Sequence, residues 1–255
     1  MPPMAHAADG MISFVVPAHN EEAMLGRALR SIFAAAAATA RPFEVIVVDD
    51  ASTDRTSKIA AAAGARVVRV DLRQISAVRN AGARQARGDV LVFLDADTEL
   101  PPRTLVAALA ALDRGAVGGG ARVIFDGPVN ILMEFLTFLF VMVWFSFGWA
   151  AGCFIFARRS AFEAVGGFDQ QYFIAEEMYL SRALARVGRF VILRQQVITS
   201  GRKTRMYSMR EMLSKSIRLL LRGPSAFRQR EGLDLWYECG REEGDIPAHR
   251  TGVSS

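Results

Sequence analysis

The chain has 255 residues, of which 51% are hydrophobic, so it can form one large domain, or one domain with an extension. Its formal net charge of +5 is modest, and no nucleic-acid-binding motif accompanies it. Its cysteines, Cys153 and Cys239, show neither metal-ligand spacing nor a disulfide framework, which favours a reducing compartment. The N-terminus lacks the basic start and apolar core of a signal peptide, so the sequence predicts a cytoplasmic protein.

The first hundred residues or so alternate short apolar runs with helical stretches. We expect a helix over 74–87 and, in chain order, strands over 12–17, 43–48, 65–70 and 89–94. Such alternation predicts an α/β fold in which helices cover both faces of a parallel sheet. Ligands of such folds bind beyond the carboxyl ends of the strands.

Acidic residues follow these strands at the edge where ligands are expected. Leu94 is followed by Asp95-Ala96-Asp97, and an earlier strand ends in Asp49-Asp50. Carboxylates are hard oxygen ligands suited to a divalent cation. The pair Asp95 and Asp97 is ambiguous by itself, because Thr98 followed by Pro101 also resembles the start of a helix.

Four motifs in this part of the chain give the acidic pair a context. They are Val16-Pro17-Ala18-His19-Asn20-Glu21, Val48-Asp49-Asp50-Ala51-Ser52-Thr53-Asp54, Arg79-Asn80-Ala81-Gly82 and Gly88-Asp89-Val90-Leu91-Val92-Phe93-Leu94-Asp95-Ala96-Asp97. In this order they resemble the nucleotide-sugar half of family 2 glycosyltransferases. The resemblance covers roughly residues 11–200 and implies the GT-A (Rossmann-like) fold, a mixed, mostly parallel sheet flanked by helices, here followed by a helical C-terminal extension.

Other nucleotide-binding folds fit less well. The turn after the first strand is Pro17-Ala18-His19-Asn20-Glu21, whereas a Rossmann dehydrogenase needs Gly-x-Gly-x-x-Gly there. Gly118-Gly119-Gly120 precedes an expected strand and opens no helix, which indicates close backbone packing. The sequence has no P-loop.

The resemblance implies donor-binding roles for five residues. Pro17, His19 and Glu21 would shape the first loop around the base and ribose of a nucleoside diphosphate sugar. Asp50 would accept a hydrogen bond from a ring N–H of the nucleobase. Arg79 would lie against the nucleobase or its phosphates, a role suited to a planar cation.

The resemblance also implies a metal and a base. Asp95 would face the ribose and the cation, and Asp97 would ligate Mg²⁺ or Mn²⁺. Glu177, or as an alternative Glu176, would take the proton from the acceptor hydroxyl. The family motif at this place often reads Glu-Asp, and the sequence here reads Glu-Glu. Two glutamates that open a helix can also serve only as partners of its dipole, so this reading stays open.

The region 201–230 is strongly basic. It contains nine basic residues against one acid, and Met209, Met212, Leu213, Ile217 and Leu220 recur at helical spacing. The helix they predict either lies in a membrane interface or packs on the domain and exposes its arginines. Arg202 and Arg205 are among the basic residues that would border the apolar surface of this helix, where they suit a diphosphate or an anionic headgroup.

The segment 131–157 is the most apolar, and its last 23 residues carry no charge. About 20 apolar residues can span a bilayer. A single span would, however, separate the metal motif from the candidate base, which must share one active site. We therefore expect a helix to about Ser146 and a buried strand over 151–157. The helix would form an acceptor wall, enter one leaflet or make a homodimer, and the sequence leaves these three open.

These features together predict an inverting, metal-dependent glycosyltransferase. It would move a sugar from a UDP-sugar to a hydroxyl acceptor that is lipid-linked or membrane-proximal, on the inner face of the cell membrane. Alternatives are an inactive nucleotide-sugar binding module and a nucleotidyltransferase, although the latter usually has a glycine-rich, basic phosphate loop. The expected organisation is a tail (1–10), a nucleotide-sugar half (11–126), an acceptor half of the same domain (127–200), the basic amphipathic extension (201–230) and a polar tail (231–255).

Overall fold

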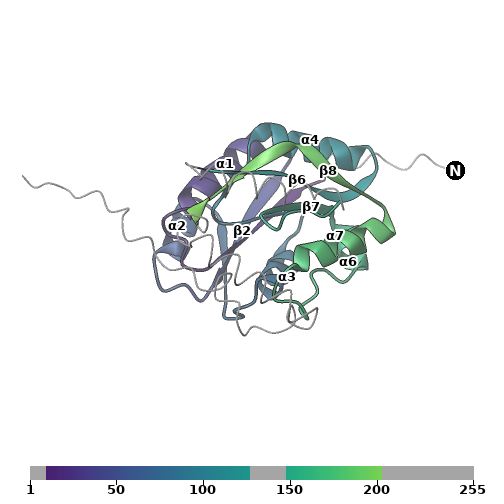
Figure 1. Cartoon of the computed structure of the whole chain (residues 1–255). Helices are drawn as coiled ribbons and strands as arrows, with labels where there is room; N and C mark the ends of the chain where they lie inside the picture. The colour runs from purple at the N-terminus through teal and green to yellow at the C-terminus, as the bar shows by residue number, and fades with distance from the viewer. Residues whose placement is uncertain (1–9, 127–147, 203–255) are drawn as a thin grey trace, which may run out of the picture.

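The computed structural model describes residues 10–126 and 148–202 of the chain (Figure 1). In the first part the elements are β1 (Ile12–Ala18), α1 (Leu25–Ala37), β2 (Phe43–Asp50), α2 (Thr56–Ala62), β3 (Arg66–Val70), α3 (Ile75–Gln85), β4 (Val90–Leu94), β5 (Thr98–Glu99), α4 (Pro102–Asp113) and β6 (Ala116–Phe125). The second part contains β7 (Phe154–Arg158), α6 (Arg159–Ala164), α7 (Glu176–Val187) and β8 (Arg189–Thr199).

The strands form one 8-stranded sheet in the order β3-β2-β1-β4-β7-β6-β8-β5. The pairs β3-β2, β2-β1, β1-β4 and β6-β8 are parallel, and β4-β7, β7-β6 and β8-β5 are antiparallel. Helices α1, α2 and α4 pack on one face of the sheet, and α3, α6 and α7 pack on the other (Figure 1). The predicted mixed, mostly parallel sheet flanked by helices is confirmed.

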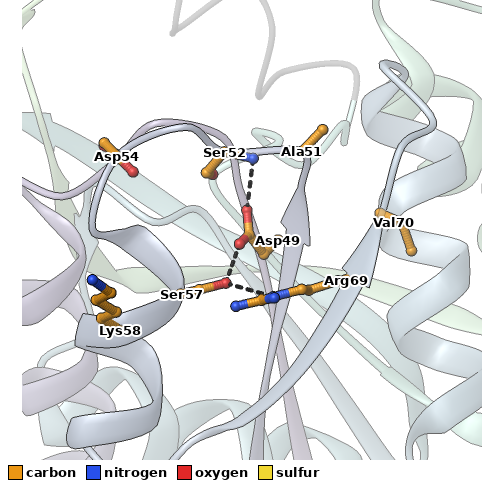
Figure 2. A pocket seen from close by; sticks show the side chains of 8 residues that line it. All are labelled: Asp49, Ala51, Ser52, Asp54, Ser57, Lys58, Arg69 and Val70. Atoms are coloured by element: carbon orange, nitrogen blue, oxygen red, sulfur yellow. Dashed lines mark hydrogen bonds between the residues drawn. The ribbon is translucent and has the colours of Figure 1, made fainter.

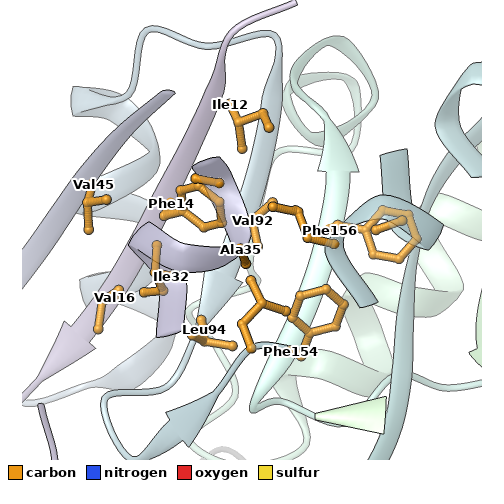
Figure 3. Packing of buried hydrophobic residues seen from close by; sticks show 14 of the residues in the cluster. Ile12, Phe14, Val16, Ile32, Ala35, Val45, Val92, Leu94, Phe154 and Phe156 are labelled. Carbon is orange, nitrogen blue, oxygen red and sulfur yellow. The ribbon is translucent and has the colours of Figure 1, made fainter. Parts of the chain in front are cut away.

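The central strands are apolar along their whole length because both of their faces are buried. In β4, Val90, Val92 and Leu94 join the core under α1 and α4, whereas Leu91 and Phe93 point to the core under α3. Figure 3 shows Val92 and Leu94 with their neighbours in the first of these cores. Burial of each large apolar side chain contributes about 1.5–3 kcal/mol, so this layered core fixes the sheet edge on which the polar residues sit.

Two expectations about β6 and β7 need correction. The buried strand expected over 151–157 is β7, and it begins only at Phe154 because a turn precedes it, in which Phe154 N donates to Ala151 O at 3.2 Å. Gly118-Gly119-Gly120 lies within β6 and does not precede it. Close backbone packing there is confirmed, since a Cβ on Gly118 would lie 2.8 Å from the carbonyl oxygen of Phe156.

Several predictions concern residues outside those described. These are the tails 1–9 and 231–255, the apolar helix expected over 131–146, Arg205, and the amphipathic helix expected after Arg202. Within 10–126 and 148–202, no helix is both long and apolar enough to cross a membrane.

Candidate active site

The two aspartates of the acidic pair follow β4 in a tight turn. Thr98 N donates to Asp95 O at 3.0 Å, and Asp95 N donates to Cys153 O at 3.2 Å. Thr98 then belongs to the short strand β5, and α4 begins only at Pro102. The acidic pair is therefore held at the carboxyl edge of the sheet and does not cap a helix.

Asp97 lies beside the end of the last strand. Its Oδ1 is 3.4 Å from the hydroxyl oxygens of both Thr98 and Thr199, and its carbonyl oxygen accepts from Ser200 N at 3.2 Å. Asp95 keeps 33% of its side chain exposed, so a ligand can reach it. Strand ends far apart in the sequence thus position the two carboxylates.

The donor set of Asp95 and Asp97 fits Mg²⁺ or Mn²⁺. These hard cations are usually bound by one or two carboxylates together with substrate phosphates and water, without a complete cage of protein ligands. In the described part of the chain no three His, Cys, Asp or Glu side chains cluster as a metal cage. The predicted metal roles of Asp95 and Asp97 remain predictions.

Arg79, from α3, lies buried behind the acidic pair with 2% of its surface exposed. Its Nη1 donates to Glu176 Oε1 at 2.7 Å, and its Nη2 donates to Asp95 Oδ1 at 2.8 Å and to Gly152 O at 2.9 Å. Its guanidinium carbon also lies 5.3 Å from the ring centroid of Phe168. Burial alone would lower the pKa of Arg79, but Asp95 and Glu176 outweigh this and raise it, so the side chain stays charged.

The rest of the Arg79 motif serves packing. Asn80 brackets the backbone of Phe168, because its Nδ2 donates to Phe168 O at 2.8 Å and its Oδ1 accepts from Phe168 N at 3.0 Å. Gly82 brings α3 close to the sheet, since a Cβ there would lie 2.8 Å from Val48 Cγ2. The motif thus sets the distance between α3 and the sheet and, through it, the place of Arg79.

Glu176 and Glu177 open α7, and the structure gives them different surroundings. Glu176 is 5% exposed and bonded to Arg79, whereas Glu177 is partly buried beside Gly152. Burial, together with the neighbouring charge of Glu176, raises the pKa of Glu177 to about 8. Burial raises the pKa of Glu176 as well, although Arg79 opposes the shift. A carboxyl with a pKa near neutrality, next to the acidic pair, is the better candidate for a base.

The donor-side residues lie at the ends of β1 and β2. Pro17 lies inside β1 in register with Val48, beyond the residues of β1 that pair with β4. His19 Nδ1 is 2.7 Å from Asp50 O. The Asp50 carboxylate accepts hydrogen bonds from Leu72 N at 2.7 Å and from Arg73 N at 2.9 Å. Asp50 therefore holds the loop after β3, and its predicted contact with a nucleobase is untested.

Glu21 and Arg202 meet although 181 residues separate them. Arg202 Nη2 donates to Glu21 Oε1 at 3.0 Å, and Glu21 N donates to Thr56 Oγ1 at 2.8 Å. The structure thus brings Glu21, a predicted donor-site residue, together with Arg202 of the basic region across the edge of the sheet. Their roles toward a ligand, like that of Arg205 outside the described residues, remain predictions.

Asp49, the neighbour of Asp50, points to the opposite face of β2, because side chains alternate along a strand. There it lines a cavity of about 220 Å³, shown in Figure 2, with Ala51, Ser52, Asp54, Ser57, Lys58, Arg69 and Val70. Asp49 Oδ1 accepts from Ser52 N at 3.0 Å, and Ser57 links Asp49 Oδ2 to Arg69. Asp49 therefore shapes the loop between β2 and α2, and the lining of this cavity contains neither the acidic pair nor Glu177.

Comparison with known families identifies the family of the chain. Residues 13–166, more than half of the chain, match the sequence model of glycosyl transferase family 2, and the chain belongs to this family.

Curated relatives match over a shorter stretch. A protein of Pseudomonas paraeruginosa named undecaprenyl-phosphate 4-deoxy-4-formamido-L-arabinose transferase is 41% identical over 103 residues, which are 37% of this chain and 30% of that protein. A protein of the same name from Edwardsiella ictaluri is 36% identical over 112 residues, which are 41% of this chain and 34% of that protein. The matches span about a third of each relative.

Solved structures show the same fold. A mannosyltransferase from Pyrobaculum calidifontis in complex with GDP-Man and Mn²⁺ superposes with a TM-score of 0.61 at 22% identity, covering 82% of this chain and 65% of that chain. Glucosyl-3-phosphoglycerate synthase from Mycobacterium tuberculosis in complex with Mn²⁺, UDP and glucosyl-3-phosphoglycerate gives 0.57 at 20% identity, covering 85% and 80%. The chain has the GT-A fold of glycosyltransferases.

Proposed function

We propose that this protein transfers a sugar, with inversion, from a nucleoside diphosphate donor, UDP-linked in the first instance, to a hydroxyl group of a lipid-linked acceptor. One observation carries the proposal. Asp95 of the acidic pair after β4 and the candidate base Glu177 on α7 lie on either side of Gly152 and Arg79, although they come from opposite halves of the sequence. The family of the chain supports a sugar donor for this site.

The donor side would be built by the ends of β1, β2 and β4. Asp95 and Asp97 would hold Mg²⁺ or Mn²⁺, which, when bound, neutralises charge on the leaving nucleoside diphosphate. Three hydrogen bonds hold the adjoining loops in place: His19 Nδ1 bonds to Asp50 O, Glu21 N donates to Thr56 Oγ1 of α2, and the Asp50 carboxylate accepts from Leu72 N. Neighbours solved with Mn²⁺ and either UDP or GDP-Man support a nucleotide sugar and a divalent ion.

On the acceptor side, Glu177 would take the proton of the acceptor hydroxyl. The hydroxyl oxygen forms the new bond to the anomeric carbon from the face opposite the leaving diphosphate, which inverts the configuration. The proton moves to the Glu177 carboxylate and the bonding electrons leave with the diphosphate. A positioned base with a pKa close to the working pH contributes about 10²–10⁴-fold to the rate of such a step.

The names of the curated relatives favour an alternative acceptor, which is undecaprenyl phosphate itself. The phosphate of such a lipid is itself an anionic nucleophile near neutral pH and needs no base to remove a proton. Glu177 would then be dispensable for transfer. Either acceptor would bring the protein to the surface of a membrane, as a peripheral enzyme on the side where nucleotide sugars are made.

The test is a transfer assay on the purified protein with a panel of UDP- and GDP-sugars. Each sugar is offered with Mn²⁺, Mg²⁺ or a chelator, and with either undecaprenyl phosphate or a hydroxyl-bearing lipid-linked saccharide. We expect metal-dependent transfer from a UDP-sugar to the saccharide. Transfer to undecaprenyl phosphate alone would support the alternative acceptor. Tight, metal-dependent UDP binding without transfer or hydrolysis of any donor would mean that the protein is a binding module.

A further inference from the structure

The buried guanidinium of Arg79 touches three segments that are remote in the sequence. Its partners are Asp95 after β4, Gly152 before β7 and Glu176 at the start of α7. The first belongs to the donor side of the proposed site, and the last lies next to Glu177 on the acceptor side. Few side chains can do this, because it takes a planar cation with several donors pointing in different directions.

Because Arg79 is buried, its main contacts are with other protein groups and not with solvent or a ligand. The side chain is 3% exposed, Glu176 is 7% exposed, and Asp95 is 33% exposed. Asp95 therefore turns one oxygen to Arg79 and remains accessible from the open side. Charge-assisted hydrogen bonds of this kind in a dry environment are strong and hold side chains in a narrow range of orientations.

We propose that Arg79 is a positioning residue of this site. It holds the candidate metal ligand Asp95 directly and, through Glu176, the helix that carries Glu177, so that Asp95 and Glu177 keep a fixed position relative to each other. The inference rests on the proposed function and adds a role that the resemblance does not give to Arg79 or Glu176. Arg79 acts through Asp95 and Glu176 and does not itself touch the reacting atoms.

A purely structural ion pair would stabilise the fold without coupling two functions, and it gives a different mutational pattern. Arg79→Lys keeps the charge, but an ammonium group cannot serve all three acceptors in the directions that the guanidinium serves. Both sides of the site should then loosen. Glu176→Ala breaks only the bond to α7, and Glu176→Gln keeps an oxygen that can accept from Nη1.

Arg158→Lys is the matched control. Arg158 is partly buried, donates from Nε to Ala116 O at 3.2 Å and from Nη2 to Leu112 O at 2.6 Å, and lies in β7 opposite Val90, the first residue of β4. It therefore supports the same sheet at the edge away from Asp95. Its replacement should cost stability and leave the active site unchanged.

The experiment measures thermal unfolding, Mn²⁺-dependent UDP binding by calorimetry, and kcat and KM of transfer for the four variants and the wild type. We expect Arg79→Lys to weaken UDP binding and to lower kcat, each by about 10–100-fold, as loss of a group that orients a metal ligand does. Glu176→Ala should lower kcat and leave UDP binding unchanged, and Glu176→Gln should restore much of kcat. Arg158→Lys should change only the unfolding temperature.

Full UDP binding and kcat in folded Arg79→Lys would overturn the proposal. The proposal would also be overturned if the losses of UDP binding and kcat in Arg79→Lys were no larger than those in Arg158→Lys and were explained by the fraction of folded protein alone. If Arg79→Lys does not fold, the comparison of Glu176→Ala with Glu176→Gln tests the proposal. Equal kcat in Glu176→Ala and Glu176→Gln, or weakened UDP binding in Glu176→Ala, would contradict the inference. Failure of the wild type to bind UDP with Mn²⁺ would instead refute the proposed function, on which the inference depends.

Discussion

Gly152 lies against the carboxyl group of Glu177, and a Cβ placed on Gly152 would be 3.6 Å from Glu177 Cδ and 3.4 Å from Arg79 Nη2. The methyl group of Gly152→Ala therefore fits, but it takes water away from Glu177. We expect it to raise the pKa of Glu177 further and to lower transfer at neutral pH about tenfold for each unit of that rise. A pH–rate profile of Gly152→Ala that is displaced to higher pH would show this rise in the pKa of Glu177.

Gly26→Ala is the control for this prediction. A Cβ on Gly26 in α1 would meet atoms at similar distances, 3.5 Å from Arg30 Nη1 and 3.8 Å from Ile59 Cγ2, and these atoms lie outside the site. The variant should keep the wild-type profile. If Gly152→Ala keeps it too, the carboxyl of Glu177 does not govern the rate.

Ala175, just before α7, is held in the left-handed region at φ 60° and ψ 19°. For a residue with a Cβ this conformation costs about 1 kcal/mol or more, and such strain is found next to functional residues. Ala175→Gly should therefore raise the free energy of unfolding by up to about 1 kcal/mol in urea titrations. Ala185→Gly, on the exposed side of the same helix, should lower it by about as much. Destabilisation by both would mean that Ala175 is not strained.

The raised pKa of Glu177 predicts a loss of stability with rising pH in the metal-free protein. Below pH about 4.5, the ordinary value, the carboxyl is protonated in both the folded and the unfolded chain. Between this value and about 8 the folded chain keeps the proton and the unfolded chain does not, so the free energy of unfolding falls as pH rises. Glu177→Gln should reduce this fall in denaturation measured with a chelator present. An equal fall in both proteins would place the titrating group elsewhere.

Asp97→Asn tests the metal assignment. It removes an anionic ligand but keeps an oxygen near the hydroxyl groups of Thr98 and Thr199, so the fold should survive. Calorimetry should show weaker Mn²⁺-dependent binding of UDP. Asp113→Asn is the control, because Asp113 pairs with Arg41 and has a side chain that is 43% exposed. Unchanged metal-dependent affinity in Asp97→Asn would exclude Asp97 as a ligand.

Much of the sheet could be predicted from the sequence because its strands are short apolar runs that end in polar residues. The runs before Asp50 and Asp95 predicted β2 and β4 and placed both carboxylates at the same edge. The start of β7 could not be predicted, because Ala151 and Cys153 continue the apolar run and the turn that separates them from the strand depends on a backbone hydrogen bond from Phe154 N to Ala151 O.

The connections within the site were beyond such reasoning. Arg79 and Glu176 are 97 residues apart, and their bond depends on how α3 and α7 pack on the sheet. The motif at Arg79 could be found, whereas the direction of its side chain could not. The contact of Gly152 with Glu177 likewise follows from tertiary packing, and no spacing in the sequence indicates it.

The most direct test of the account is the rate of sugar transfer to a hydroxyl acceptor by Glu177→Gln under single-turnover conditions, with donor and Mn²⁺ bound. The variant should bind UDP with Mn²⁺ as the wild type does and transfer about 10²–10⁴-fold more slowly, because the proton of the acceptor loses its base. Glu176→Gln should be less affected, because its amide can still bind Arg79. A Glu177→Gln variant that transfers at the wild-type rate would contradict the central claim that Glu177 is the base.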